Sequence, residues 1–208
     1  MASCHVLPAL RGQYMNRSNR VMSRAAGLLV LIYLLFLNPP FPLNPQVSEM
    51  AEIIGLLLLV IATCSRIFCV MYSAGSKNKR LLSSGPFSIV RNPLYVSSFI
   101  GIVGFGLVSG DLLLLACLII FICIYYTITV AGEEQHLTAT FGSDYDDYRS
   151  HTPRWFPRWG QYHSPDRLEI RPALVLKGTF YASCFVALYF ILELFSGLRE
   201  AGILPVIG

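Results

Sequence analysis

The feature that most constrains this chain is a series of apolar segments that are long enough, or nearly long enough, to cross a bilayer. A helix needs about 20 predominantly apolar residues to span the hydrocarbon layer. Four segments stand out, at residues 53–72, 94–108, 112–130 and 173–195. Only residues 109–111 separate the second of them from the third, and so short a link is typical of a tight helical hairpin.

A fifth apolar segment, residues 25–37, ends at a cluster of prolines between Pro39 and Pro45. It follows an arginine-bearing tail as a signal peptide would, but no small-residue cleavage site comes after it, so we expect it to be retained as an anchor. Only 13% of the residues are charged, about half the share of a soluble domain. The sequence therefore predicts an all-α, polytopic transmembrane bundle of about five spans, forming one domain over residues 1–208.

Lysine and arginine are distributed unequally between the loops. They occur before residue 25, between residues 73 and 93, and between residues 149 and 171, whereas residues 38–52 and 109–111 contain none. Because cytoplasmic loops carry the excess of positive charge, we expect the N-terminus and both basic segments to be cytoplasmic. The membrane would be the inner membrane of a bacterium or the endoplasmic reticulum of a eukaryote. The formal net charge of +4 fits contact with membrane lipids. The sequence has no basic stripe with interleaved aromatics, which would have indicated binding to nucleic acid.

The two polar segments on the basic side, residues 73–93 and 131–172, could together cover the bundle. In the second, Leu137, Phe141, Tyr145 and Tyr148 recur at the spacing of an amphipathic helix, which indicates one buried face. Gly142 weakens that helix midway, so a break after Phe141 is expected.

Arg91 and Asn92 stand just before Pro93, which can open a helix at its first turn. A helix N-terminus with a fixed cation can bind a carboxylate or phosphate. The alternative is an arginine whose side chain reaches to the headgroups. Arg66, inside the apolar segment at residues 53–72, leaves the same two interpretations open.

Glu133 and Glu134 lie where the span expected at residues 112–130 leaves the membrane, on the same side as Arg91. Such a pair can hold an ammonium, a sulfonium or a ribose diol, although a solvated helix end is the simpler interpretation. Adjacent residues point about 100° apart on a helix, so one of the two should face the bundle. Glu133-x-x-His136 is the sole Glu-x-x-His unit, whereas a di-iron bundle needs it twice, and we expect no metal. Gly101, Gly104 and Gly106 are assigned to close helix packing.

Three stretches together resemble the isoprenylcysteine carboxyl methyltransferase and phospholipid methyltransferase family. They are Gly85-Pro86-Phe87-Ser88-Ile89-Val90-Arg91-Asn92-Pro93-Leu94-Tyr95, then Glu133-Glu134 with Leu137, Phe141, Gly142, Tyr145 and Tyr148, and then Pro153-Arg154-Trp155-Phe156-Pro157. The resemblance covers roughly residues 66–157.

That resemblance implies a membrane enzyme that uses S-adenosylmethionine, held under the cytoplasmic segments, and a lipophilic substrate that arrives from the bilayer. The expected cofactor-binding residues are Gly85, Pro86, Arg91, Asn92, Pro93, Tyr95, Glu133 and Glu134. The expected catalytic residues are Arg91, Tyr95, His151 and Arg154. Many family members have histidine in place of Asn92, and members that methylate carboxyl groups tend to have arginine or lysine in place of His151, so the acceptor stays open.

We favour methylation of a lipophilic carboxylate, as in isoprenylcysteine, because Arg91, Arg154 and a protonatable His151 would make the mouth of the site positive. The alternatives are N-methylation of a phospholipid or other lipid amine, a sterol-reductase-like enzyme that uses NADPH, and a non-catalytic transporter or scaffold. Bound dinucleotide would favour the reductase. A transporter should have its polar groups at mid-membrane, whereas here they cluster at one edge.

Overall fold

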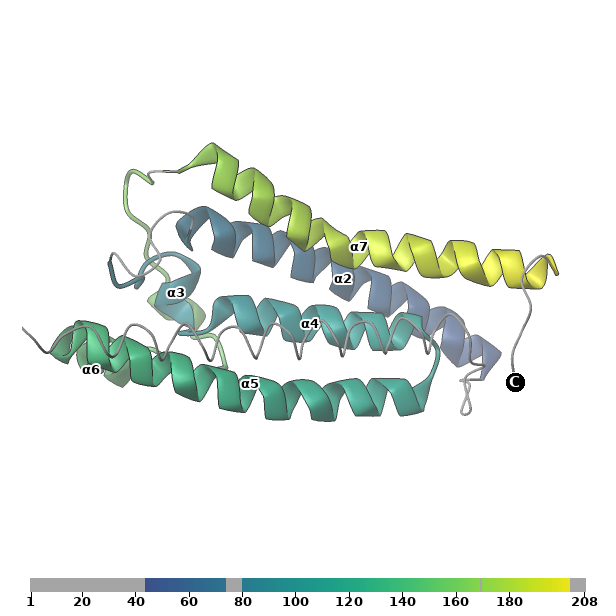
Figure 1. The fold of residues 1–208 in the computed structure, drawn as a ribbon, viewed down its shortest axis with the longest axis horizontal. Coiled ribbons are helices and arrows are strands. Elements are labelled where there is room, and N and C mark those ends of the chain that lie inside the picture. Colours follow the sequence, from purple (N-terminus) through teal and green to yellow (C-terminus); the bar gives the residue numbers. More distant parts are fainter. Residues whose placement is uncertain (1–43, 74–79, 169, 203–208) are drawn as a thin grey trace, which may run out of the picture. The chain divides into compact units, whose positions relative to one another are not determined.

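The computed structural model describes residues 44–73, 80–168 and 170–202, and the secondary-structure elements in these residues are helices (Figure 1). The helices are α2 (Pro45–Ser73), α3 (Pro86–Ile89), α4 (Pro93–Val108), α5 (Leu112–Phe141), α6 (Ser143–His151), the 3-10 turn η1 (Trp159–Gln161) and α7 (Pro172–Glu200). The chain divides into two units, of which the larger comprises residues 39–194. The span expected at residues 25–37 lies outside the described residues.

Among the described residues, three helices are long and apolar enough to cross a membrane, namely α2, α5 and the part of α7 from Pro172 to Phe195, and α4 is a shorter apolar helix. The four apolar segments expected at residues 53–72, 94–108, 112–130 and 173–195 all lie in these helices, and two of the helices are longer than the segments. Helix α2 begins at Pro45 rather than at residue 53, and α5 continues to Phe141 rather than ending at residue 130. Hydropathy marks where a helix leaves lipid, and both helices continue as polar helix beyond that point.

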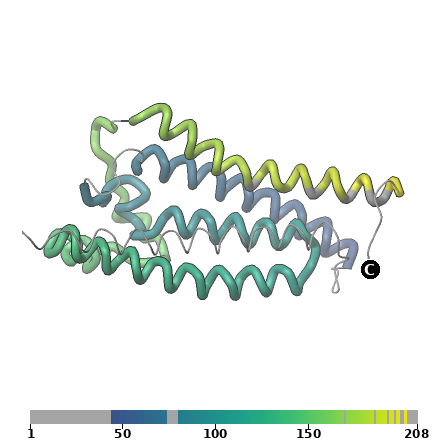
Figure 2. The backbone as a smooth tube through the Cα atoms, viewed as in Figure 1, coloured from purple at the N-terminus to yellow at the C-terminus, as the bar shows by residue number. Residues whose placement is uncertain are grey.

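Helix α4 packs against α2 and α5, and the tube view shows it between them (Figure 2). Its contact with α2 depends on glycine, because a Cβ on Gly104 would lie 2.7 Å from the Gly55 carbonyl oxygen. The packing role expected of Gly104 is therefore confirmed. Helix α7 contacts α2 through Thr63, whose hydroxyl lies 3.4 Å from the Ala182 carbonyl oxygen, and through Tyr189, which donates to Glu52 over 3.1 Å.

The link between α4 and α5 is the tight hairpin that the sequence indicated. Asp111 caps α5 by accepting hydrogen bonds from the Leu113 and Leu114 amides at 2.9 and 3.4 Å. The break expected after Phe141 is also present, because α5 ends there and Gly142 has a φ of 55° before α6 begins. Helix α6 turns the buried Tyr145 inward.

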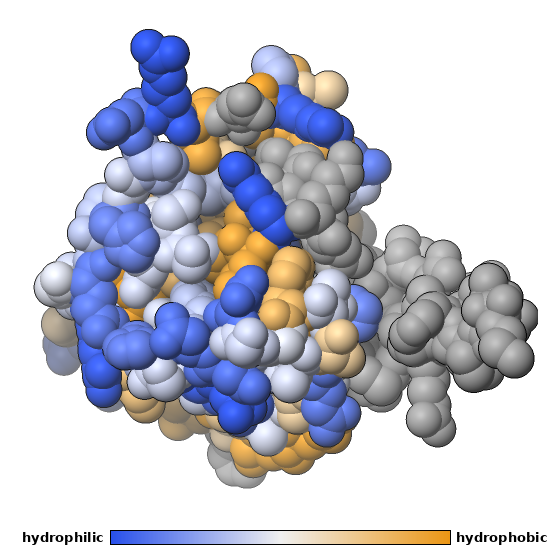
Figure 3. All heavy atoms as spheres, turned by 90° about the vertical axis from the view of Figure 1, so that its left-hand side faces the viewer, coloured by the Kyte–Doolittle hydropathy of each residue, from blue (hydrophilic) through white to orange (hydrophobic). Residues whose placement is uncertain are grey.

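Residues 152–171, which we call the strap, connect α6 to α7. Their backbone binds the segment between α2 and α4 at three places: Arg91 N–H donates to Pro153 O (2.8 Å), Arg158 N–H to Ile89 O (2.9 Å) and Gly85 N–H to His163 O (2.7 Å). The two polar segments thus cover one end of the bundle together. Figure 3 looks at that end, where hydrophilic residues surround a smaller apolar area.

Candidate active site

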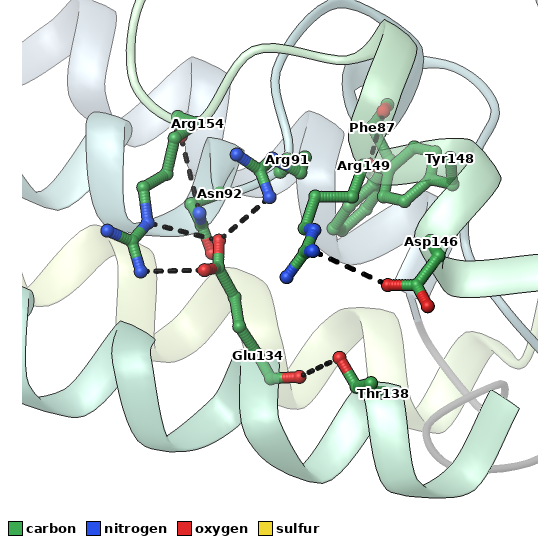
Figure 4. A network of polar contacts seen from close by, with 9 residues as sticks. All are labelled: Phe87, Arg91, Asn92, Glu134, Thr138, Asp146, Tyr148, Arg149 and Arg154. Carbon is green, nitrogen blue, oxygen red and sulfur yellow. Dashed lines mark hydrogen bonds and ion pairs between the residues drawn. The ribbon is translucent and has the colours of Figure 1, made fainter. Parts of the chain in front are cut away.

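Three charged side chains from distant parts of the chain meet at this end of the bundle (Figure 4). Glu134, on α5, lies between the guanidinium groups of Arg91 and Arg154. Its Oε1 is 3.2 Å from Arg91 Nη1, and its two oxygens accept from Arg154 Nε at 3.1 Å and Arg154 Nη2 at 2.6 Å. The Arg91 and Glu134 side chains are each 13% exposed, and that of Arg154 is 34% exposed. The cluster therefore has two positive charges for one negative charge.

The local chain course fixes both arginines. Arg91 precedes Asn92, the N-cap residue of α4, and Pro93 opens that helix as the sequence indicated. The amide group of Asn92 does not cap the helix; its Nδ2 donates instead to the Arg154 carbonyl oxygen over 3.3 Å. Asn92 thereby ties the strap to the start of α4, close to the cluster.

Gly85 and Pro86 shape the turn that precedes Arg91. Gly85 has a φ of 61°, and a Cβ there would overlap the ring of Tyr72, so both its conformation and its surroundings require glycine. Pro86 opens the short helix α3. Both residues contribute here through the backbone, with Gly85 N–H bound to the strap at His163.

Two tyrosines of α6 complete the wall beside Arg91. Tyr145 is 1% exposed; burial and the Glu134 carboxylate raise the pKa of its hydroxyl, while a hydrogen bond with Arg91 opposes the rise. Tyr148 donates to the Phe87 carbonyl oxygen over 2.7 Å. Neither tyrosine was among the expected site residues. The helical stripe that contains them was the available signal, and it specified burial without specifying their neighbours.

Glu133 is exposed and lies close enough to Tyr95 for a side-chain hydrogen bond. Of the two glutamates, Glu134 thus belongs to the partly buried cluster, whereas Glu133 is exposed and borders Tyr95, in line with their angular separation on a helix. The Tyr95 ring packs edge to face on that of Tyr126, with centroids 4.8 Å apart. Deeper in the bundle, Arg66 donates to Ser98. Arg66 therefore contacts α4 inside the bundle.

The contacts of His151 do not include the residues of the cluster. Its ring is 74% exposed, and its Nδ1 lies 3.8 Å from an Asp147 carboxylate oxygen and 2.8 Å from Ser150 Oγ. Both partners are on α6, so no contact of the ring that we observe joins it to Arg91, Glu134 or Arg154. Across the described ranges, no three histidine, cysteine, aspartate or glutamate side chains are grouped so as to hold a metal ion.

The residues present fit S-adenosylmethionine. Within the described part of the chain, Arg91 Nε and Nη1 are buried and have no hydrogen-bond partner. Nη1 is near Glu134, but its geometry is that of an ion pair and not of a directed hydrogen bond. Donors left in this state favour an anionic ligand such as the carboxylate of the cofactor. Glu133 is available to an ammonium group or a ribose diol.

A helical membrane protein with a charged, partly buried site at one end of its bundle is the class that this geometry defines. The family model described as phospholipid methyltransferase matches residues 50–144. The chain is 30% identical to the cobalt-zinc-cadmium resistance protein CzcN of Cupriavidus metallidurans, over 76% of this chain and 73% of that protein. The chain belongs to the phospholipid methyltransferase family, which is a family of membrane methyltransferases.

Two further relatives match over shorter stretches. The nickel-cobalt-cadmium resistance protein NccN of Alcaligenes xylosoxydans xylosoxydans is 36% identical over 53% of this chain and 52% of that protein. The protein-S-isoprenylcysteine O-methyltransferase of Schizosaccharomyces pombe is 26% identical over 42% of this chain and 37% of that protein. No solved structure matches the chain. Of the three relatives, CzcN and NccN are named for resistance to metals, and the third is named for the reaction that it catalyses.

Proposed function

We propose that this protein transfers a methyl group from S-adenosylmethionine to a carboxylate on a lipophilic acceptor. The observation that carries the proposal is the Arg91–Glu134–Arg154 cluster, which has an excess positive charge and buried Arg91 donors without a hydrogen-bond partner among the described residues. When bound, S-adenosylmethionine supplies a methyl group on a sulfonium sulfur. The chain has to bind, align and exclude water, and needs no nucleophile of its own.

Each site residue then has a distinct task. Arg91 binds the carboxylate of the cofactor, and Glu133 binds its ammonium group or its ribose diol. Glu134 holds the two arginines in place, and Arg154, which is one third exposed, remains able to attract the acceptor. Tyr95 lies beside Glu133 and forms the wall towards α5. Gly85, Pro86, Asn92 and Pro93 set the course of the backbone around Arg91. His151 has no task in the proposal, because the contacts of its ring lie within α6.

Charge balance favours a carboxylate over an amine as the acceptor. The positive groups are Arg91, Arg154, the cofactor ammonium and the sulfonium. The negative groups are Glu133, Glu134 and the cofactor carboxylate. An acceptor carboxylate would make the two sets equal, whereas a neutral amine leaves an excess positive charge and a protonated amine increases it. A poorly hydrated site penalises such an excess.

The second candidate is N-methylation of a phospholipid headgroup, which the description of the matching family model favours. Incubating membranes that contain the protein with methyl-labelled S-adenosylmethionine separates the two. Base treatment of the extracted lipids releases labelled methanol from methyl esters and leaves N-methyl groups in place. Volatile label supports the carboxylate, and label that stays in the lipid supports the amine. Membranes that contain the Arg91→Ala variant provide the background.

We also propose the arrangement in the membrane. Five spans follow from the apolar segments, and the bias of lysine and arginine favours the cytoplasmic side for the N-terminus and the site, in a bacterial inner membrane or in the endoplasmic reticulum. The acceptor would reach the site from the bilayer, since α2, α4 and α5, which lead to it, each contain a long apolar stretch.

A further inference from the structure

The strap carries large aromatic side chains that are exposed. Phe156 is 85% exposed, Trp159 75% and Tyr162 48%. Scattered exposed apolar residues are common on any protein, but three aromatics within seven positions of one connecting segment are a patch. Arg158 and Arg167, both exposed, belong to the same segment. We call these five residues the aromatic–basic patch.

The backbone of the strap holds this patch beside the ends of the apolar stretches of the helices. Arg158 N–H is bound to Ile89 and Arg91 N–H to Pro153, so the strap lies beside the link between α2 and α4. Arg154 binds Glu134, only four residues beyond Val130, where the apolar part of α5 ends. The strap then enters α7 at Pro172. The ends of three apolar helices thus define the height of the strap.

The exposed residues of the patch are of the kinds that occur in the headgroup layer of a bilayer. The headgroup layer of a bilayer is where tryptophan and tyrosine concentrate, because each has an apolar ring and a polar group that stays hydrated. Basic side chains in the same layer contact lipid phosphates. A pocket of about 280 Å³ beside the strap is lined in part by Arg80, Arg167, Ser83 and Ser84, which are groups that suit a phosphate.

We propose that the aromatic–basic patch lies in the headgroup layer of the leaflet on the basic side, with Phe156 and Trp159 inserted between lipids and the arginines bound to anionic phosphates. The occupant of the patch is the lipid surface itself. The strap would then act as a third type of membrane contact, in addition to the spans, and would hold the covering of the site against the bilayer. This inference does not depend on methyl transfer.

The chain offers a direct probe, since its two tryptophans, Trp155 and Trp159, are both in the strap. The Trp155→Phe variant leaves Trp159 as the single fluorophore, and Trp159→Phe leaves the less exposed Trp155 as the matched control. The full-length variants are reconstituted into phosphatidylcholine vesicles in which part of the lipid is brominated near the headgroup end of the acyl chains. Bromine quenches from within the bilayer, so the orientation of the protein in the vesicle does not matter.

We expect shallow brominated lipid to quench Trp159 severalfold more than deep brominated lipid does, and its emission to be shifted to the blue relative to free tryptophan in water. The proposal would be overturned if neither brominated lipid quenched Trp159 while dissolved iodide did so in detergent-permeabilised vesicles. That result would indicate that the patch binds a soluble partner. If a variant does not fold, wild-type protein still tests the proposal, because emission unaffected by both brominated lipids would mean that neither tryptophan lies in the bilayer.

The charge component has its own test. Brominated phosphatidylglycerol is compared with brominated phosphatidylcholine at the same content, using the Trp155→Phe protein and the same protein with Arg158→Gln and Arg167→Gln. We expect the anionic lipid to quench more strongly, and the difference to disappear in the arginine variant. Equal quenching by the two lipids in the Trp155→Phe protein would contradict a preference for anionic lipid.

Discussion

Replacing Glu134 by glutamine should loosen the strap as well as the site. The change keeps the size of the side chain but removes the charge that both arginines contact, at 3.2 Å for Arg91 and at 2.6 and 3.1 Å for Arg154. Losing one partner of a fully buried ion pair costs about 3–5 kcal/mol, and since Arg154 is one third exposed we expect roughly 2–4 kcal/mol. For a chain of this size that corresponds to a melting temperature lower by about 5–15 °C.

The control is Glu133→Gln, next to it on the same helix. Glu133 is exposed, and a surface change of this kind should cost less than about 0.5 kcal/mol. Unfolding is followed in detergent by tryptophan emission, which reports on the strap because Trp155 and Trp159 are both there. Equal melting temperatures for the two variants would refute the view that Glu134 holds the strap to the bundle.

Three further predictions concern the membrane, the helix packing and the pH. Single cysteines placed at Ser84 and Asn44 in a protein without its native cysteines should be labelled from opposite sides of sealed vesicles, and labelling of both from one side would contradict the proposed topology. Gly104→Ala should destabilise by about 1–3 kcal/mol because its Cβ would lie 2.7 Å from the Gly55 carbonyl oxygen; Gly160→Ala, with nothing within 4 Å, is the control and should be close to neutral. Burial raises the pKa of Tyr145 and Tyr148 above the ordinary value of 10.0, so their contribution to stability is complete below pH 10 and is lost as the pH rises further; Tyr148→Phe should show a smaller alkaline loss in melting temperature than wild type, and an identical pH profile would count against it.

The helices were predictable where a local signal was strong. Pro93 and the hairpin residues 109–111 set the bounds of α4, and Gly142 set the break between α5 and α6. The starting point of α2 was missed because Glu49 and Glu52 end the apolar pattern, although they remain helical. Helix α3 was not foreseen, since its four residues depend on the positive φ of Gly85 and on the strap, and neither is visible in a periodicity.

The site was predictable in its composition and not in its pairing. Arg91, Glu134 and Arg154 could each be singled out by position and by the family resemblance. That one carboxylate would contact both arginines depends on how residues 43 and 20 positions away in the chain fold back, which no spacing reveals. Arg66 illustrates the same limit: the sequence left function and snorkelling open, and the contact with Ser98 comes from the packing of α2 on α4.

Binding of S-adenosylhomocysteine to the purified protein tests the central claim most directly. Wild-type protein, Arg91→Ala and the control Arg149→Ala are titrated by calorimetry in detergent; Arg149 is also on the site side of α6, but it is half exposed and pairs only loosely with Asp146, at 3.6 Å. We expect wild type and Arg149→Ala to bind alike, and Arg91→Ala to lose about 2–5 kcal/mol of binding free energy because it removes a charged partner in a poorly hydrated site. Wild-type affinity in folded Arg91→Ala, or no binding to wild type, would contradict the account.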